Sequence, residues 1–192
     1  LMLWSDLTEF YAKNGFYSFG KEWRFYFNYN SFQTSQTHKK TLRVDPSSLC
    51  DSQIENILEI RCPTKITLKR NIDEFRILLQ IPETKLILSY DSNIMAGYGI
   101  IGKGYDMVGV IHEWGAKTKS TIHEILLGAF KETGFQQIVL LTPTDIKKDI
   151  DKYLSNLAIN KKEHTLGLGC LLQQHEQKID PNDFFVWGLD SI

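Results

Sequence analysis

The clearest hydrophobic pattern lies in the middle of the chain. Residues 96–101 and 107–113 carry apolar side chains in the manner of two β-strands. A polar turn follows at 115–120, and residues 137–141 form a short apolar run that Pro143 closes. A continuous run of this kind is typical of a strand that is covered on both faces.

A helix is predicted between the polar turn and that last strand, over residues 121–133. Its apolar side chains recur at three- and four-residue spacing, which places them on one face. They are Ile122, Ile125, Leu126, Ala129 and Phe130. Because a strand, a helix and a strand follow one another, the strands at 107–113 and 137–141 are predicted to pair in parallel.

The first 40 residues carry an aromatic pattern of their own. Residues 1–4 read as a strand and 6–13 as a short helix. Residues 22–27 alternate like a strand, and 30–40 are polar and read as a linker or an exposed loop. An aromatic strand left at a sheet edge invites pairing. We therefore expect 22–27 to extend the main sheet or to pair across a dimer.

The remaining segments complete an α/β pattern. The sequence predicts a strand at 41–44, helices from Ser47 or Ser48 to 60, at 71–79 and at 145–157, and strands at 85–90, 165–173 and 184–188. A hairpin turn is expected at 91–93. This order of elements predicts an α/β protein with a mixed, twisted sheet flanked by helices.

Composition limits the classes of protein that remain possible. The 192 residues are 42% hydrophobic and 23% charged, which suits a packed core. The formal net charge of −1 does not favour a nucleic-acid partner. No apolar run reaches the roughly 18–20 residues of a membrane span, and the first residues do not resemble a signal peptide. Cys50, Cys62 and Cys170 lack the spacing of a metal site and read as reduced thiols. We expect a cytoplasmic protein with no membrane partner.

Two regions of the sequence, 95–133 and 5–23, resemble the GNAT (Gcn5-related N-acetyltransferase) superfamily. MAGYGIIGKG at 95–104 resembles its third strand, GVIHEWG at 109–115 its fourth, and 121–133 the helix that holds acetyl-CoA. SDLTEFYAKNGFYSFGKEW at 5–23 resembles the end of a GNAT domain. The resemblance implies a GNAT-like acyl-CoA N-acyltransferase fold.

The same resemblance predicts the domain organisation. Residues 1–40 are expected to be the tail of an upstream GNAT-like unit with a linker, and 41–192 a GNAT-like domain, as in a tandem protein. FVWGLDSI at 185–192 resembles the C-terminus of such tandem proteins. In this family a bulge in the fourth strand splays it from the fifth, and Gly109 is the expected site of that bulge. Gly102 and Gly104 are read as turn residues.

The resemblance implies transfer of an acetyl group from acetyl-CoA to a small-molecule or peptide amine. The reaction needs a base for the amine proton and an acid for the departing thiolate. Glu113, at the end of the fourth strand, is the candidate base, because a half-buried carboxylate can have a raised pKa. His112 is a second candidate, although a regular strand would point it to the opposite face. Tyr153 stands where the acid is expected. The alternatives are a structural hydrogen bond or ion pair for Glu113, a core position for His112, and packing for Tyr153.

The turn before the helix is the candidate acetyl-CoA site, because N–H groups at a helix N-terminus bind phosphate. The candidate cofactor-binding residues are Ile111, Trp114, Gly115, Lys117, Lys119, Ser120 and Thr121. The family motif, Arg/Gln-x-x-Gly-x-Gly/Ala, would fall on 118–123, where Thr121 and His123 replace its glycines. A solvated lysine-rich turn and a core Trp114 are the alternatives. A second interpretation of the chain therefore stays open: a non-catalytic GNAT-like half that binds a small ligand or supports a partner unit.

Overall fold

The computed structural model describes residues 2–3, 7–32, 40–64, 68–170, 180 and 183–188. Its strands are β1 (Met2–Leu3), β2 (Tyr17–Asn28), β3 (Lys40–Val44), β4 (Lys85–Asp91), β5 (Ile94–Lys103), β6 (Asp106–Ala116), β7 (Gln137–Pro143) and β8 (Asn160–Gly169). Its helices are α1 (Thr8–Ala12), α2 (Asp51–Ile60), α3 (Ile72–Leu79), α4 (Lys119–Thr133) and α5 (Lys148–Leu157), with two short 3-10 helices, η1 (Tyr29–Phe32) and η2 (Pro46–Ser48).

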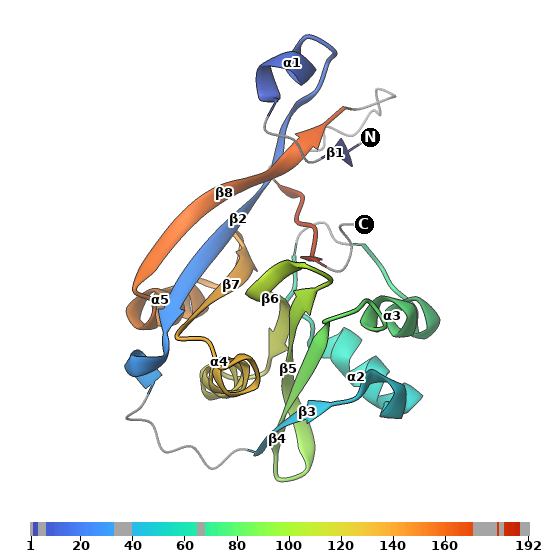
Figure 1. Ribbon diagram of the computed structural model, residues 1–192, viewed down its shortest axis with the longest axis vertical. Helices are drawn as coiled ribbons and strands as arrows, with labels where there is room; N and C mark the ends of the chain where they lie inside the picture. The colour runs from blue at the N-terminus through green and yellow to red at the C-terminus, as the bar shows by residue number, and fades with distance from the viewer. Residues whose placement is uncertain are drawn as a thin grey trace.

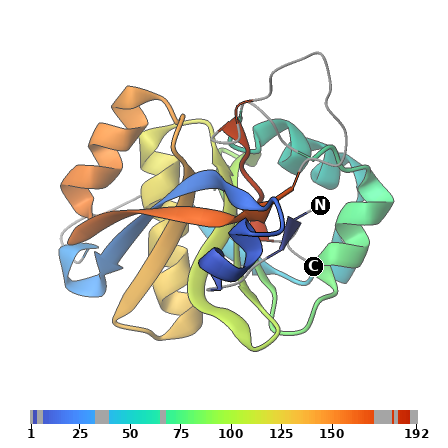
Figure 2. The ribbon, with the colours of Figure 1, turned by 90° about the horizontal axis from the view of Figure 1, so that it is seen from above.

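The strands form one mixed sheet in the order β1-β8-β2-β7-β6-β5-β4-β3 (Figure 1). Strands β6 and β7 are parallel, and every other neighbouring pair is antiparallel. Helices α4 and α5 lie on one side of the sheet, and α2 and α3 lie on the other (Figure 2). The predicted α/β class and the parallel pairing of the two central strands are confirmed.

Two hydrophobic cores fill the spaces between the sheet and the helices. Tyr98 and Ile100 of β5 are buried in the core beside α2 and α3. Gly97 and Gly99 alternate with them and face α4, where a Cβ added to either glycine would lie 2.5 Å from a side chain of that helix. The two glycines therefore let α4 approach the sheet closely.

Local sequence signals set the ends of the helices. The N–H of Thr121 donates to the Thr118 hydroxyl at 3.2 Å, and Gly134 ends α4 with a left-handed φ of 70°. At the start of α3, the Glu74 N–H donates to the Asn71 side chain at 2.8 Å, and the Asn71 N–H donates to the Glu74 carboxylate at 2.9 Å.

Strand β2 lies inside the sheet, between β7 and β8. It pairs with β7 from Glu22 to Asn28 and with β8 from Tyr17 to Tyr26. Phe25 is among its fully buried residues. The prediction that residues 22–27 join the main sheet is confirmed, and they join it in the interior.

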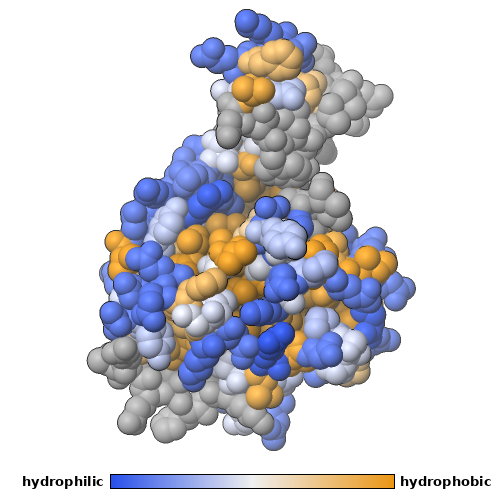
Figure 3. Space-filling view, viewed as in Figure 1, coloured by the Kyte–Doolittle hydropathy of each residue, from blue (hydrophilic) through white to orange (hydrophobic). Residues whose placement is uncertain are grey.

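Strands β2 and β8 also extend beyond the main body and carry α1 (Figure 1). No residue of α1 is buried, and Phe10 is 60% exposed. Apolar surface is visible on this extension in the space-filling view (Figure 3).

Two predicted helices begin later than expected. The helix expected from Ser47 or Ser48 begins at Asp51, because Pro46–Ser48 forms a separate 3-10 turn in which the Ser47 N–H donates to Asp45. The helix expected at 145–157 begins at Lys148. The short helix expected at 6–13 spans Thr8–Ala12, and residue 6 lies outside the described part of the chain.

The strand predicted at 165–173 begins at Asn160, because pairing with β2 includes the charged residues before 165. Residues 171–173 lie outside the described part of the chain, as do 1 and 4 of the predicted first strand and 33–39 of the predicted linker. The turn at 91–93 is confirmed, with positive φ at Ser92 and Asn93.

The final strand predicted at 184–188 is wrong. Phe184 makes an isolated bridge, and residues 185–187 have no regular structure. Phe185 and Trp187 are buried, with their rings 4.6 Å apart in an edge-to-face contact. The position between β7 and β8 is already filled by β2. Phe185 and Trp187 instead pack into the core that contains residues of β6 and β7.

Replacing Phe25 with alanine should lower the free energy of unfolding by about 3–5 kcal/mol, because the ring is fully buried. The matched control is Phe10→Ala on α1, which removes an exposed ring and should cost no more than about 0.5 kcal/mol. Urea unfolding of both variants measures the difference. Equal losses would contradict the interior position of β2.

Candidate active site

Strands β6 and β7 pair over only two positions, Val110 with Val139 and Ile111 with Leu140. Strand β6 continues to Ala116 and β7 to Pro143 without a further pair between them in the described part of the chain. Ile111, a predicted cofactor-binding residue, is thus the last residue of β6 that pairs with β7. The two strands diverge at their C-terminal ends, as expected.

The bulge that accompanies this divergence is at His112, and not at Gly109 as predicted. Strand β5 pairs with Glu113 and then with Ile111, which leaves His112 as an extra residue in β6. Gly109, with a φ of 73°, lies in a second irregularity nearer to the start of β6. The extra residue interrupts the alternation of side chains along β6. The rule that neighbouring residues face opposite sides of a regular strand therefore does not hold for His112 and Glu113.

Glu113 is held in a buried ion pair. Nη1 of Arg70 lies 2.9 Å from its Oε1 and 2.8 Å from its Oε2, and the Tyr98 hydroxyl donates to Oε1 at 3.1 Å. The side chains of Arg70 and Glu113 are 2% and 0% exposed. Burial raises the pKa of Tyr98, and the Glu113 charge adds to this shift. The expectation of a half-buried carboxylate is therefore corrected, because α3 and the residues before it cover Glu113.

His112 is fully buried, and its Nε2 lies 2.8 Å from the carbonyl oxygen of Gly102. Burial lowers the pKa of His112 to about 4, so the ring is neutral at pH 7 and can donate to that carbonyl. A Cβ added to Gly188 would lie 2.6 Å from the ring, so the C-terminal segment packs directly against it. These contacts are those of a core histidine.

Tyr153 lies on α5, and its hydroxyl is 3.5 Å from Nδ1 of His123 on α4. Burial raises the pKa of Tyr153, and the charge of Glu124 adds to it. Tyr153 packs on the core beside α4, whereas Tyr98 and the Glu113 that it contacts belong to the face covered by α2 and α3. The structure does not bring Tyr153 to Glu113.

Polar groups of the turn before α4 contact other groups of the chain. The N–H of Lys117 donates to Ala96 at 2.9 Å, and the Lys119 ammonium pairs with Asp149 at 3.1 Å. The Thr118 hydroxyl contacts those of Ser120 and Thr121 at 2.9 and 2.8 Å. The predicted residues Lys117, Lys119, Ser120 and Thr121 thus gather at one helix end, as expected, and Thr118 already accepts one of its N–H groups.

Residues 60–62 lie against the diverging end of β6. The Cys62 N–H donates to the Trp114 carbonyl at 3.1 Å, and Arg61 forms an isolated antiparallel bridge with Gly115. A Cβ added to Gly115 would lie 2.3 Å from the carbonyl oxygen of Ile60, so only glycine permits this approach. Burial raises the pKa of Cys62 to about 12, with a contribution from Asp145, so the thiol stays protonated.

Trp114, on β6, contacts β7 at the same diverging end of the two strands. Its indole N–H donates to the Leu141 carbonyl of β7 at 3.0 Å, and its side chain is buried. The indole therefore connects the two strands beyond the point where their backbones separate. This is the core position that was the alternative to a cofactor-binding role for Trp114.

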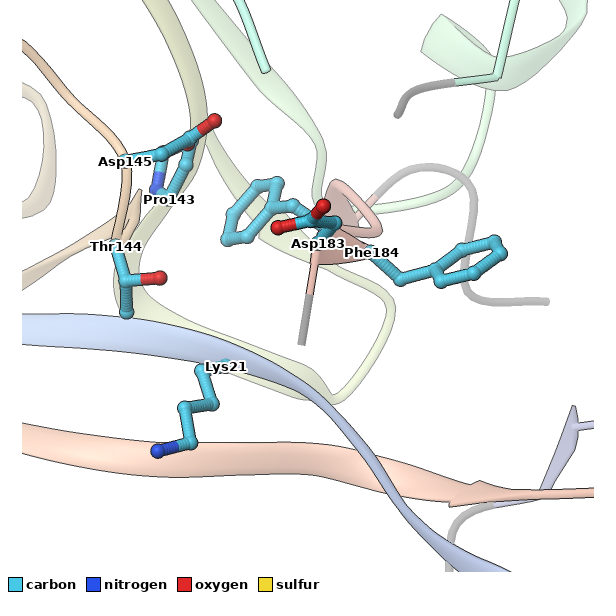
Figure 4. A pocket seen from close by; sticks show the side chains of 7 residues that line it. Lys21, Pro143, Thr144, Asp145, Asp183 and Phe184 are labelled. Atoms are coloured by element: carbon cyan, nitrogen blue, oxygen red, sulfur yellow. The ribbon is translucent and has the colours of Figure 1, made fainter. Parts of the chain in front are cut away.

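A cavity of about 160 Å³ lies at the C-terminal end of β7 (Figure 4). It is lined by Lys21, Pro143, Thr144, Asp145, Asp183, Phe184 and Phe185. Lys21 pairs with Glu163 at 3.0 Å. The cavity thus combines two carboxylates with aromatic walls, and it lies beside the divergence of β6 and β7.

Sequence reasoning missed Arg70, Tyr98 and the segment at Arg61 and Cys62. A charged residue before a helix cap reads as a solvated loop residue, and nothing local indicates that Arg70 reaches Glu113. The alternation of Gly97, Tyr98 and Gly99 did carry a signal, because it marks a face with small residues opposite a large one.

Among the described residues, no three His, Cys, Asp or Glu side chains are grouped so that they could hold a metal ion. In that part of the chain, no helix combines the length and apolar character needed to cross a bilayer.

The fold is that of GCN5-related N-acetyltransferases. A conserved protein of Enterococcus faecalis, titled a probable N-acyltransferase, superposes with a TM-score of 0.62 at 15% identity, over 87% of this chain and 43% of that one. A GCN5-related N-acetyltransferase of Kribbella flavida gives a TM-score of 0.54 at 13% identity, over 85% of this chain and 41% of that one. One of Anabaena variabilis gives a TM-score of 0.52 at 12% identity, over 87% of this chain and 43% of that one. The chain thus spans less than half of the length of these proteins. No protein-family model and no curated protein sequence matches the chain.

Replacing Arg70 with glutamine should lower the free energy of unfolding by about 3–5 kcal/mol, because it leaves the Glu113 charge buried without its cation. The control is Lys119→Gln, which breaks a pair whose side chains are 45% and 62% exposed and should cost at most about 1 kcal/mol. Urea unfolding distinguishes the two. A small loss for Arg70→Gln would show that solvent reaches Glu113.

Acidification should destabilise the protein through His112. Its pKa is about 4 when folded and near 6.5 when unfolded, so between these values the unfolded chain binds the extra proton. From pH 7 to pH 5 this costs about 2 kcal/mol of folding free energy. A His112→Gln variant should lose this part of the pH dependence. Urea unfolding of both proteins at pH 7 and at pH 5 tests this prediction. If the unfolding free energy of the variant falls between these pH values as much as that of the wild type, the prediction is wrong.

Proposed function

We propose that the chain is an acetyl-CoA-dependent N-acetyltransferase unit of GNAT type, with a small-molecule or peptide amine as the acceptor. The proposal is carried by the divergence of β6 and β7 next to a carboxylate, Glu113, within a fold whose solved neighbours are titled N-acetyltransferases. The acceptor class is part of the proposal and rests on the resemblance of the fold to N-acetyltransferases.

In this proposal Glu113 takes the proton of the acceptor amine, and Arg70 and Tyr98 hold its carboxylate in place. The amine reaches Glu113 only if Arg70 moves, because the carboxylate is buried against it. The neutral His112 supports the bulge from which Glu113 projects, and takes no proton itself.

The residues present do not receive acetyl-CoA in the conformation described. The β6 backbone at Trp114 and Gly115 is occupied by Arg61 and Cys62, and Thr118 caps the helix end that would face the pyrophosphate. The Cys62 N–H hydrogen bond has a net contribution of about 0.5–1.5 kcal/mol, and the Arg61–Gly115 bridge and the buried Cys62 side chain add to the cost of opening the site. A micromolar ligand gains about 8 kcal/mol on binding. Part of this free energy would be spent on displacing Arg61 and Cys62 from β6.

The same contacts favour a second candidate function, a non-catalytic unit that supports a partner acyltransferase unit. Here Trp114 and Cys62 are permanent parts of the core, and Glu113 is a structural ion-pair partner of Arg70. The two candidates differ in two measurable properties, the affinity for acetyl-CoA and the acetylation of amines.

Calorimetric titration of acetyl-CoA into the purified chain should give saturable heat if the first function holds. Replacing Lys117 and Lys119 with alanine should then weaken binding by about 1–2 kcal/mol, the share of two exposed cations. Glu113→Gln should keep the binding and abolish acetylation of a panel of amines. Circular dichroism of each variant controls for folding.

Absence of both heat and a thermal shift with acetyl-CoA would contradict the first function and support the second. If the Glu113→Gln variant binds acetyl-CoA and still acetylates the amines, the chain is an enzyme but Glu113 is not its base.

A further inference from the structure

A second cavity, of about 310 Å³, lies at the opposite end of β6 from the candidate active site. Its lining comes from the starts of β4 and β6, the end of β5 and the C-terminal end of α4. The lining residues are Glu83, Lys85, Ile101, Gly102, Gly104, Tyr105, Val108, Gly109, Thr133 and Phe135. The volume is at the lower limit of small-molecule pockets.

The apolar part of the lining suits a flat ring system. Buried Ile101 belongs to it, together with the exposed side chains of Tyr105, Val108 and Phe135. Exposed apolar side chains gathered around a cavity mark a binding surface more often than those scattered singly. The Phe135 ring lies over Gly109, where an added Cβ would be 3.0 Å from it, so the glycine lets the ring rest against β6.

The backbone around the cavity is held in an unusual conformation. Glu83 and Met107, which are not glycines, have positive φ values of 60° and 55°, and so do Gly102, Gly104 and Gly109 at 74°, 58° and 73°. Such a conformation costs free energy at Glu83 and Met107, whereas glycine adopts it readily, and strained residues of this kind are found at ligand sites where neighbouring structure enforces them. Here they turn the ends of three strands around one hollow.

The lining also holds one cation and one anion. The Lys85 ammonium donates to the Glu132 carbonyl at the end of α4 at 3.3 Å, which leaves it further N–H groups for a ligand. Glu83 lies two residues before Lys85 and has an exposed side chain. A ligand with a ring, a carboxylate and an ammonium group would complement all three features.

We propose that this cavity binds a free aromatic amino acid. The ring lies among Tyr105, Val108 and Phe135, the ligand carboxylate meets Lys85, and the ligand ammonium meets Glu83. The proposal is independent of the proposed acetyltransferase function, because it uses none of the residues assigned to that site.

The test uses the whole chain and three probes: tryptophan, tryptamine, which lacks the carboxylate, and indole-3-propionate, which lacks the ammonium. Tryptophan should bind in calorimetry, and each analogue should bind about tenfold more weakly because one charge-assisted hydrogen bond is lost. Lys85→Gln should remove the preference for tryptophan over tryptamine. Glu83→Gln should remove the preference for tryptophan over indole-3-propionate.

Val108→Lys places a charge in the cavity and should abolish binding. Its matched control is Ile94→Lys in β5, because Ile94 is 66% exposed, close to the 62% of Val108, and does not line the cavity. No binding of tryptophan to the wild-type chain, or equal binding of all three probes, would overturn the proposal. Binding that survives Val108→Lys would overturn it as well.

Discussion

The point at which β6 and β7 stop pairing governs the arrangement of the candidate active site. One extra residue in β6, His112, interrupts the register with β5, and the parallel pairing with β7 ends at the residue before it. Beyond this point each strand has backbone groups without the partner that a continuous ladder would supply. The indole of Trp114 donates to one such carbonyl, and the Cys62 N–H donates to another.

The connection between α2 and α3 braces β6 in two ways. Its first residues, Arg61 and Cys62, contact the backbone of β6 at Trp114 and Gly115. Its last residue before the α3 cap, Arg70, neutralises the Glu113 carboxylate. A buried charge is tolerated only with a partner of opposite sign, so Arg70 ties α3 to the sheet electrostatically. The Glu113 carboxylate is therefore covered by its own ion-pair partner.

Two irregularities in the pairing of β6 with β5 lie on either side of Ile111. The C-terminal end carries the bulge at His112 and the candidate active site, and the N-terminal end carries Gly109 and the second cavity. The middle, around Ile111, packs into the core below α4. This division is physically reasonable, since bulges and breaks in a ladder are where a sheet can present backbone and side chains to a ligand.

The sequence by itself determined the elements whose signals are local. The spacing of Ile122, Ile125 and Leu126 predicted α4, and the run before Pro143 predicted β7, because burial imposes these periodicities on any sequence. The order of elements then sufficed to predict the parallel pairing of β6 and β7 and the gathering of the turn residues at the start of α4.

Only the tertiary structure decided the features that join distant parts of the chain. Strand β2 lies between β7 and β8, whereas Phe185 and Trp187 pack into the core without forming a strand, and no local pattern in either segment indicates this. Likewise, nothing near Arg70 predicts its ion pair with Glu113, and nothing near Cys62 predicts its contact with Trp114. Side-chain spacing reports which face of an element is buried, whereas the partner that buries it is selected by the packing of the whole chain.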